Sequence, residues 1–187
     1  KTKVLSQKLD GKFLKKGTVV LKVKARTQSI LAAERSALNF LGLMSGIATK
    51  AYTFAKIAKP YGVKIFSTRK TIVGIRELQK YALTKGGANI NRMTLDDFFF
   101  IKDNHIANAT SIIESIAQAR IFYPKKKITV EVDNIKQLKE ILNEKIDVVL
   151  LDNMNAKQIK ECLKLVNGKF KCEASGNIKL ANLKSIA

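Results

Sequence analysis

The stretch that decides the fold lies at residues 126–153 and reads KKITVEVDNIKQLKEILNEKIDVVLLDN. Two apolar runs within it, ITVEV and IDVVLL, predict buried strands. The residues between these runs, 134–145, predict a helix. A strand, a helix and a second strand in this order predict a parallel pair of strands covered by the helix that connects them.

The same alternation continues on both sides of this stretch. Short apolar runs and helical spacing follow each other along most of the chain. We expect further strands at residues 63–68, 97–101 and 169–174, and further helices at residues 74–87, 104–123, 155–168 and 179–187. The repeat predicts the α/β class, with apolar parallel strands that helices cover.

A different pattern precedes the repeat. Residues 10–25 alternate and contain glycines, which predicts short strands joined by turns. Residues 29–58 have helical spacing, and we expect interruptions near Gly42 and Gly46. A small strand-rich part is therefore expected before the α/β repeat, with the boundary between them within residues 28–46.

Composition narrows the class of protein. The chain is 46% hydrophobic, which allows a sizeable core, and its apolar runs are far short of the roughly 20 residues that cross a bilayer. Residues 1–17 are charged and do not form the apolar centre of a secretory signal. Cys162 and Cys172 lack a metal-ligand spacing, and we interpret them as reduced thiols of a cytoplasmic protein.

The net charge of +20 raises the question of an anionic partner. The 29 lysines and six arginines are spread along the chain, and the densest run is residues 125–127. Nucleic-acid-binding proteins usually combine a basic patch with arginines or exposed aromatic rings, whereas the aromatics here lie in apolar runs. We therefore expect no specific nucleic-acid binding, and a small phosphate-rich substrate remains open.

Polar or ionisable side chains follow each of five expected strands. The carboxyl ends of parallel strands meet at one face, where ligands bind, so we expect a site there. The alternative is that these groups merely solvate the strand ends. All five ends carry such groups, with mixed charge among them, and this favours a site. These groups are Arg69 and Lys70, Lys102 to His105, Glu131 and Asp133, Asp152 and Asn153, and Ser175 to Asn177.

The residue types at these ends suit a phosphorylated or dicarboxylate ligand. Four cations can bind a polyanion, and arginine offers two-point contacts: Arg69, Lys70, Arg92 and Lys102. The carboxylates Glu131 and Asp152 suit Mg²⁺, which prefers oxygen ligands and keeps waters. The turn EASGN at residues 173–177 can offer backbone N–H groups to a phosphate.

Seven motifs in fixed order resemble the quinolinate phosphoribosyltransferases, also called nicotinate-nucleotide pyrophosphorylases (carboxylating). The resemblance covers almost the whole chain. The motifs are ERSALNFLGLMSGIAT (34–49), STRKTIVGIRELQKYAL (67–83), GGANINRMTLDD (86–97), FIKDNHI (100–106), VEVDN (130–134), LLDNM (150–154) and EASGNI (173–178).

The resemblance implies a fold and an assembly. Residues 1–45 would be part of a small N-terminal α/β sandwich domain with its connecting helix, and residues 46–187 an incomplete TIM-like α/β barrel. We expect the chain to begin within the small domain and to stop before the last barrel strand and closing helix. The family forms homodimers or multiples of dimers, in which the small domain of one subunit closes the barrel of the other.

The resemblance also implies an activity. Such an enzyme condenses quinolinate with phosphoribosyl pyrophosphate, with Mg²⁺ as cofactor. The products are nicotinate mononucleotide, pyrophosphate and CO₂, in the de novo biosynthesis of NAD.

Residue roles carry over from the matching motifs. The catalytic residues would be Lys70, Lys102, Glu131 and Asp152, and Glu131 and Asp152 would hold Mg²⁺ through water. Substrate binding would involve Arg69, Asn91, Arg92, His105, and Arg35 from the partner subunit, together with Lys70 and Lys102. Phosphate binding would involve Ser175, Gly176 and Asn177.

One position departs from the family pattern. Asn91 stands where the family usually has a histidine that helps bind a substrate carboxylate. Asparagine can donate a hydrogen bond but carries no charge, so we expect an effect on substrate affinity. Two alternatives therefore stay open: a related phosphoribosyltransferase-like paralogue with a different substrate, and a non-catalytic basic binding protein on the same scaffold.

Overall fold

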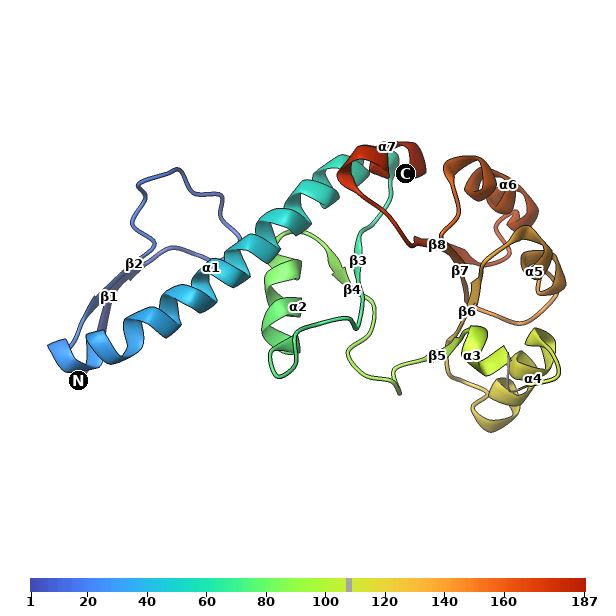
Figure 1. Ribbon diagram of the computed structural model, residues 1–187, viewed down its shortest axis with the longest axis horizontal. Coiled ribbons are helices and arrows are strands. Elements are labelled where there is room, and N and C mark those ends of the chain that lie inside the picture. The colour runs from blue at the N-terminus through green and yellow to red at the C-terminus, as the bar shows by residue number, and fades with distance from the viewer. Residues whose placement is uncertain (107–108) are drawn as a thin grey trace. The chain divides into compact units, whose positions relative to one another are not determined.

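The computed structural model describes residues 1–106 and 109–187. The chain divides into two compact units, residues 1–91 and 92–187 (Figure 1). The family resemblance places a domain boundary at residue 45, and that boundary stays a prediction.

The first unit begins with an antiparallel pair, β1 (Lys3–Gln7) and β2 (Leu21–Lys24). The strands expected within residues 10–25 are partly confirmed, because β2 lies there and β1 precedes the range. The connection between the strands contains Gly11 and Gly17, whose φ angles of 81° and 84° suit turns.

One long helix, α1 (Thr27–Ala58), follows the hairpin. The expected interruptions at Gly42 and Gly46 are wrong, because α1 continues through both. A glycine costs a helix interior only about 1 kcal/mol relative to alanine, and the good helix formers around it outweigh that cost. α1 buries Ala51 and Ala58 near its C-terminal end, whereas its first half exposes Leu31, Leu38 and Phe40.

The rest of the first unit packs on the buried half of α1. Gly86, which follows the helix α2 (Arg76–Lys85), comes so close to α1 that a Cβ there would lie 2.2 Å from the Ala48 carbonyl oxygen. The strands β3 and β4 are short and pair in parallel, and β4 was not expected. The elements are the 3₁₀ turn η1 (Lys59–Tyr61), β3 (Phe66–Ser67), α2 (Arg76–Lys85) and β4 (Asn89–Ile90).

The second unit is built on a parallel sheet with the strand order β5-β6-β7-β8. Each new strand adds to the same edge, as in an α/β barrel; a doubly wound sheet would reverse its order. The α/β class and the partial barrel are therefore confirmed. The strands are β5 (Phe99–Ile101), β6 (Ile128–Val132), β7 (Val148–Asp152) and β8 (Lys171–Ser175).

The helices α4, α5 and α6 lie together on one side of this sheet (Figure 1). Side chains from these helices and from alternate strand positions form the core, with Ile116, Val130 and Leu138 almost fully buried. The helices of this unit are α3 (Asp103–Ile106), α4 (Ile112–Phe122), α5 (Ile135–Glu140), α6 (Ala156–Val166) and α7 (Leu180–Ile186).

The single helix expected at residues 104–123 is wrong. Two helices, α3 and α4, occur instead, and residues 107–108 lie outside the described residues. Ser111 caps α4 by accepting a hydrogen bond from the Glu114 N–H at 3.1 Å, and the Glu114 carboxylate accepts one from the Thr110 N–H. This Ser-x-x-Glu spacing is a helix-start signal that the sequence already contained.

Both cysteines in the described chain are free thiols, which agrees with their interpretation as reduced. Cys162 is buried on α6, and Cys172 is half-buried on β8. Burial raises the pKa of Cys172 to about 11. Among the described residues, no helix combines the length and the apolarity that spanning a bilayer requires.

Candidate active site

The face of the β5–β8 sheet that lies opposite the helices carries four of the expected site residues, Lys102, Glu131, Asp152 and Ser175. Val149 and Leu151 belong to the core under the helices, so the alternate residues of β7, Leu150 and Asp152, point the other way. The strand register aligns three rows on this face: Phe100–Thr129–Val148–Lys171, then Glu131–Leu150–Glu173, then Asp152–Ser175.

Lys102 and Glu131 form an ion pair on this face. The Lys102 ammonium lies 3.0 Å from Glu131 Oε2 and 3.3 Å from Oε1. Ile101 pairs with Val130 in the ladder, so the residues that follow them are direct neighbours. The Lys102 side chain is 37% exposed and the Glu131 side chain 15% exposed, so both can reach a ligand without being fully solvated.

His105 holds the turn that follows β5. The Lys102 backbone N–H donates to His105 Nδ1 at 3.2 Å, and the His105 N–H donates to the Lys102 carbonyl oxygen at 2.9 Å. The two bonds fix the backbone of Lys102 at the point where its side chain enters the site face. This geometry supports a positioning role for His105.

Arg92 lies against aromatic rings that precede Lys102. Its guanidinium carbon is 4.7 Å from the Phe100 ring centroid and 5.2 Å from that of Phe98. The Lys102 ammonium is also 4.7 Å from the Phe100 centroid. Two of the expected substrate-binding cations thus share one ring.

Asp152 is connected to the turn after β8. Its Oδ2 accepts a hydrogen bond from Asn153 Nδ2 at 2.6 Å, and Asn153 Oδ1 accepts one from Asn177 Nδ2 at 3.0 Å. The Asn153 backbone N–H donates to the Ser175 carbonyl oxygen at 2.9 Å. Asn153 therefore joins the expected carboxylate to the expected phosphate loop.

Gly176 is required where Asn153 meets this turn. Its φ is 82°, and a Cβ there would lie 2.2 Å from Asn153 Oδ1. Asn153 itself has φ 52°, which asparagine tolerates better than most residues. Sequence reasoning noted Asn153 at a strand end but gave it no role, because neither its φ nor its contacts can be read from the residue type.

Four expected site residues belong to the first unit. Arg69 and Lys70 follow β3, and the Lys70 N–H donates to Thr68 Oγ1 at 3.2 Å. Arg69 Nε is buried without a hydrogen-bond partner among the described residues. Arg35 is exposed on α1, and Asn91 is the last residue of the unit.

The expectation of one sheet with five polar strand ends is wrong for β3. Four of the five ends belong to the β5–β8 sheet, but β3 pairs with β4 in a sheet of its own. Ser67 in β3 instead accepts a hydrogen bond from the buried Lys80 ammonium at 2.7 Å. Apolar runs predict that a strand forms, whereas its partner depends on residues far along the chain.

The carboxylates of the site suit a metal that the substrate also binds. Within residues 1–106 and 109–187 there is no cluster of three or more side chains that could form an all-protein metal cage. Mg²⁺ usually binds through one or two carboxylates, waters and substrate phosphates. Glu131 and Asp152, on one face beside a phosphate-type turn, fit that mode of binding.

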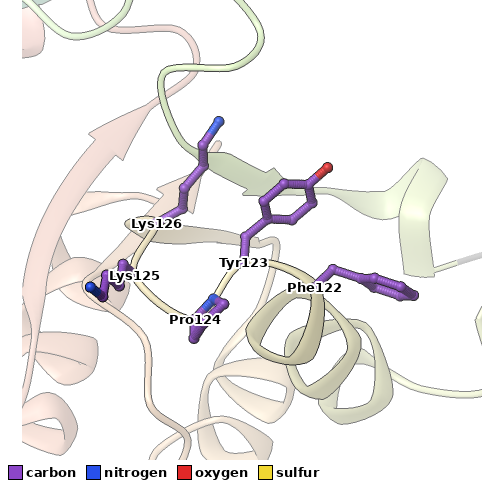
Figure 2. Close-up of a pocket in the computed structure, with 5 residues that line it drawn as sticks. All are labelled: Phe122, Tyr123, Pro124, Lys125 and Lys126. Atoms are coloured by element: carbon purple, nitrogen blue, oxygen red, sulfur yellow. The ribbon is translucent and has the colours of Figure 1, made fainter.

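A surface hollow lies away from these residues. Phe122, Tyr123, Pro124, Lys125 and Lys126 line a space of about 250 Å³ in the turn between α4 and β6 (Figure 2). This turn precedes β6, whereas the site residues follow the strands. The hollow is therefore at the opposite end of the strands from the candidate site.

The fold and the site define a class of protein. A parallel barrel sheet with cations, carboxylates and a glycine turn at its carboxyl ends is typical of α/β-barrel enzymes that bind phosphorylated ligands. The chain belongs to the quinolinate phosphoribosyltransferase family. The family's C-terminal domain model matches residues 47–187 and its N-terminal domain model matches residues 1–45.

Curated relatives agree with this assignment. A probable nicotinate-nucleotide pyrophosphorylase (carboxylating) of Methanocaldococcus jannaschii is 41% identical over 174 residues, which cover 88% of this chain and 61% of that protein. Another from Synechocystis is 37% identical and covers 95% of this chain and 62% of its own length. The chain thus spans about three fifths of these relatives' length.

Solved structures agree as well. The nicotinate-nucleotide pyrophosphorylase of Ehrlichia chaffeensis is 39% identical with a TM-score of 0.96, and the match covers 100% of this chain and 68% of that one. NadC from Streptococcus pyogenes is 36% identical with a TM-score of 0.91, and the match covers 98% of this chain and 65% of that one.

Proposed function

We propose that this chain carries the active site of a quinolinate phosphoribosyltransferase of NAD biosynthesis. The reaction would convert quinolinate and phosphoribosyl pyrophosphate to nicotinate mononucleotide, pyrophosphate and CO₂. The observation that carries the proposal is the Lys102–Glu131 pair, on the same sheet face as Asp152 and the Ser175 turn. The names of the relatives support it.

Quinolinate is a dianion, and its binding requires fixed cations. Lys102 and Arg92 would bind its carboxylates, and Arg69 and Lys70 would add charge from the end of β3. Charge-assisted hydrogen bonds of this kind are stronger than neutral ones, and the arginine forks match carboxylate geometry. Asn91 and His105 would complete the binding of this substrate.

The transfer step forms one bond and breaks another at the ribose C1. The pyridine nitrogen bonds to C1 while the C1–oxygen bond breaks and its electron pair leaves with pyrophosphate. Positive charge develops on the ribose, as in glycoside chemistry, and the carboxylates of Glu131 and Asp152 would stabilise it. The bond between the adjacent ring carbon and its carboxylate then breaks and CO₂ leaves. The electron pair stays on that carbon, where the neighbouring pyridinium nitrogen stabilises it, and a proton from water takes the place of the carboxylate.

The phosphates would be bound by two groups of residues. Ser175, Gly176 and Asn177 form a turn after β8 that can bind the 5′-phosphate with backbone N–H groups. When held through water by Glu131 and Asp152, Mg²⁺ supplies positive charge that offsets the charge of the pyrophosphate.

The Lys102–Glu131 ion pair would link the subsite for the dicarboxylate to the subsite for the ribose. The Lys102 ammonium bonds to the Glu131 carboxylate. A bound dicarboxylate would compete for the Lys102 ammonium, and the Glu131 carboxylate would then be available to the ribose. The order in which the substrates bind is thereby linked to one contact.

We also propose that a second copy of the chain covers part of the first unit. Large apolar side chains on the hairpin and on α1 are exposed, and contiguous exposed apolar surface usually marks an interface. Arg35 lies on the same stretch of α1 and would reach the partner's site. The exposed residues include Val4, Leu5, Leu21, Val23, Leu31, Leu38, Phe40 and Leu41.

We propose a cytoplasmic location, which the two free thiols support. We propose no role for nucleic acid, because the site cation Lys102 is paired with the Glu131 carboxylate. A paralogue with another substrate would share this site chemistry, so only the product can distinguish it.

The test is product formation by the complete gene product. The protein is mixed with quinolinate, phosphoribosyl pyrophosphate and Mg²⁺, and nicotinate mononucleotide is sought by mass spectrometry. We expect product that requires Mg²⁺ and falls about 100-fold or more with Lys102→Ala, since Lys102 would contact the substrate. A folded wild-type protein that forms no product would contradict the proposal.

A further inference from the structure

Phe100, the central residue of β5, holds two cations on one ring. The Arg92 guanidinium carbon and the Lys102 ammonium nitrogen each lie 4.7 Å from its centroid. Aromatic faces attract cations within about 6 Å of the centroid. The two charges are therefore no more than twice 4.7 Å apart.

A second ring supports this arrangement. Phe98 is 5% exposed, its ring meets that of Phe100 edge to face at 6.3 Å, and Arg92 lies 5.2 Å from it. Because Phe98 is packed in place, Arg92 rests against one buried ring and one ring of the site face. The contacts restrict a long side chain that would otherwise sample many rotamers.

The arrangement places two like charges against the same ring. Like charges repel, and the side chains of lysine and arginine lose rotamer entropy when they are fixed. The contacts with the rings offset these costs. A ligand that needs both cations then binds without ordering them, which raises its affinity.

We propose that Phe100 is a positioning residue that pre-organises Arg92 and Lys102 for the two neighbouring carboxylates of a pyridine dicarboxylate. This inference rests on the proposed function of the site. A ligand with two carboxylates uses both cations and gains the full benefit. A ligand with one carboxylate needs only one of them and gains less.

Three variants of the complete gene product test the inference. Phe100→Leu keeps an apolar side chain but removes the ring, and Phe100→Tyr keeps the ring. Phe99→Leu is the matched control, because Phe99 is the preceding residue and its ring packs on Tyr123 at 4.9 Å, away from the cations.

We expect Phe100→Leu to raise the KM and the Kd for quinolinate about 10-fold, the combined effect of two cation–aromatic contacts. We expect kcat and the KM for phosphoribosyl pyrophosphate to stay within about twofold, since the reacting atoms keep their partners. The affinity of Phe100→Leu for nicotinate, which has one carboxylate, should be lower than that of the wild type by about threefold at most. Phe100→Tyr should retain quinolinate binding, and Phe99→Leu should change thermal stability but not the quinolinate KM.

An independent measurement needs no substrate. NMR of labelled lysine should place the Lys102 side-chain methylene signals upfield through the Phe100 ring current, and Phe100→Leu should abolish that shift. If the wild type is active and Phe100→Leu keeps the quinolinate KM, the positioning role is wrong and the proposed function stands. If the wild type binds no quinolinate, the proposed function fails and the inference fails with it.

Discussion

Lys102 and Glu131 face each other across two neighbouring strands, with the ammonium 3.0 Å from the carboxylate. Lys102 is the cation proposed for the dicarboxylate, and Glu131 is the carboxylate proposed for the ribose. The proposed dicarboxylate subsite and the proposed ribose subsite therefore share one contact.

Glu131→Gln separates the two roles of this pair. The amide keeps the size of the side chain but cannot stabilise a positive ribose, so we expect kcat to fall about 100-fold. Lys102 would lose a competing partner, and the KM for quinolinate should stay the same or fall. Steady-state kinetics with each substrate varied in turn measures both effects. An unchanged kcat would show that Glu131 only orders Lys102.

Gly176→Ala tests the turn after β8. The backbone of Gly176 has a positive φ, and an added Cβ would lie 2.2 Å from Asn153 Oδ1, so the turn must shift. We expect the KM for phosphoribosyl pyrophosphate to rise at least about 10-fold and stability to fall by about 1–3 kcal/mol.

The matched control for this change is Gly168→Ala. Gly168 also has a positive φ, 77°, but in the described structure a Cβ there would have open space around it. The loss of stability from backbone strain in Gly168→Ala should be similar to that in Gly176→Ala, whereas the KM for phosphoribosyl pyrophosphate should stay unchanged. Equal effects of the two variants on the KM would mean that the Gly176 turn does not bind the phosphate.

Leu38→Glu tests the proposed contact with a second copy. Leu38 is 56% exposed on α1, three residues from Arg35, so the two side chains share a helix face. In an isolated chain, Leu38→Glu should leave the free energy of unfolding nearly unchanged. We expect it to shift sedimentation of the complete gene product from dimer to monomer, with loss of activity.

Leu163→Glu provides the comparison for this interface. Leu163 is 50% exposed on α6 in the second unit, so its exposure to water is similar. Its sedimentation should match that of the wild type. A wild type that sediments as a monomer would rule out the proposed assembly.

The Cys172 thiol predicts a loss of stability at high pH. Burial, with a smaller contribution from Cys162, raises its pKa in the folded chain to about 11, above the usual value of 9.0. The folded state therefore favours the neutral thiol, and this contribution is complete below pH 9 and lost between about pH 9 and 11. Urea unfolding at pH 8 and pH 10.5 measures it. Cys172→Ala should lose less stability over this range than the wild type, and equal losses would contradict the prediction.

Local patterns in the sequence were sufficient to predict most of the elements. The apolar runs at residues 126–132 and 146–151 became β6 and β7 with bounds shifted by one or two residues, because a buried strand needs only its own side chains to be apolar. The polar residues after these strands could also be predicted, because they directly follow the apolar runs in the sequence. The helix start at Ser111 was also present in the sequence, but the expectation of one longer helix missed it.

Contacts between distant residues were decided by the tertiary structure. Lys102 meets Glu131 because the register aligns Ile101 with Val130, and no pattern within either strand specifies that alignment. The pairing of β3 with β4, the Asn153 contact with Asn177, and the two cations on Phe100 depend on the register and turns in the same way. Side-chain periodicity is a local property, whereas strand partners and cation positions follow from packing between segments far apart in the chain.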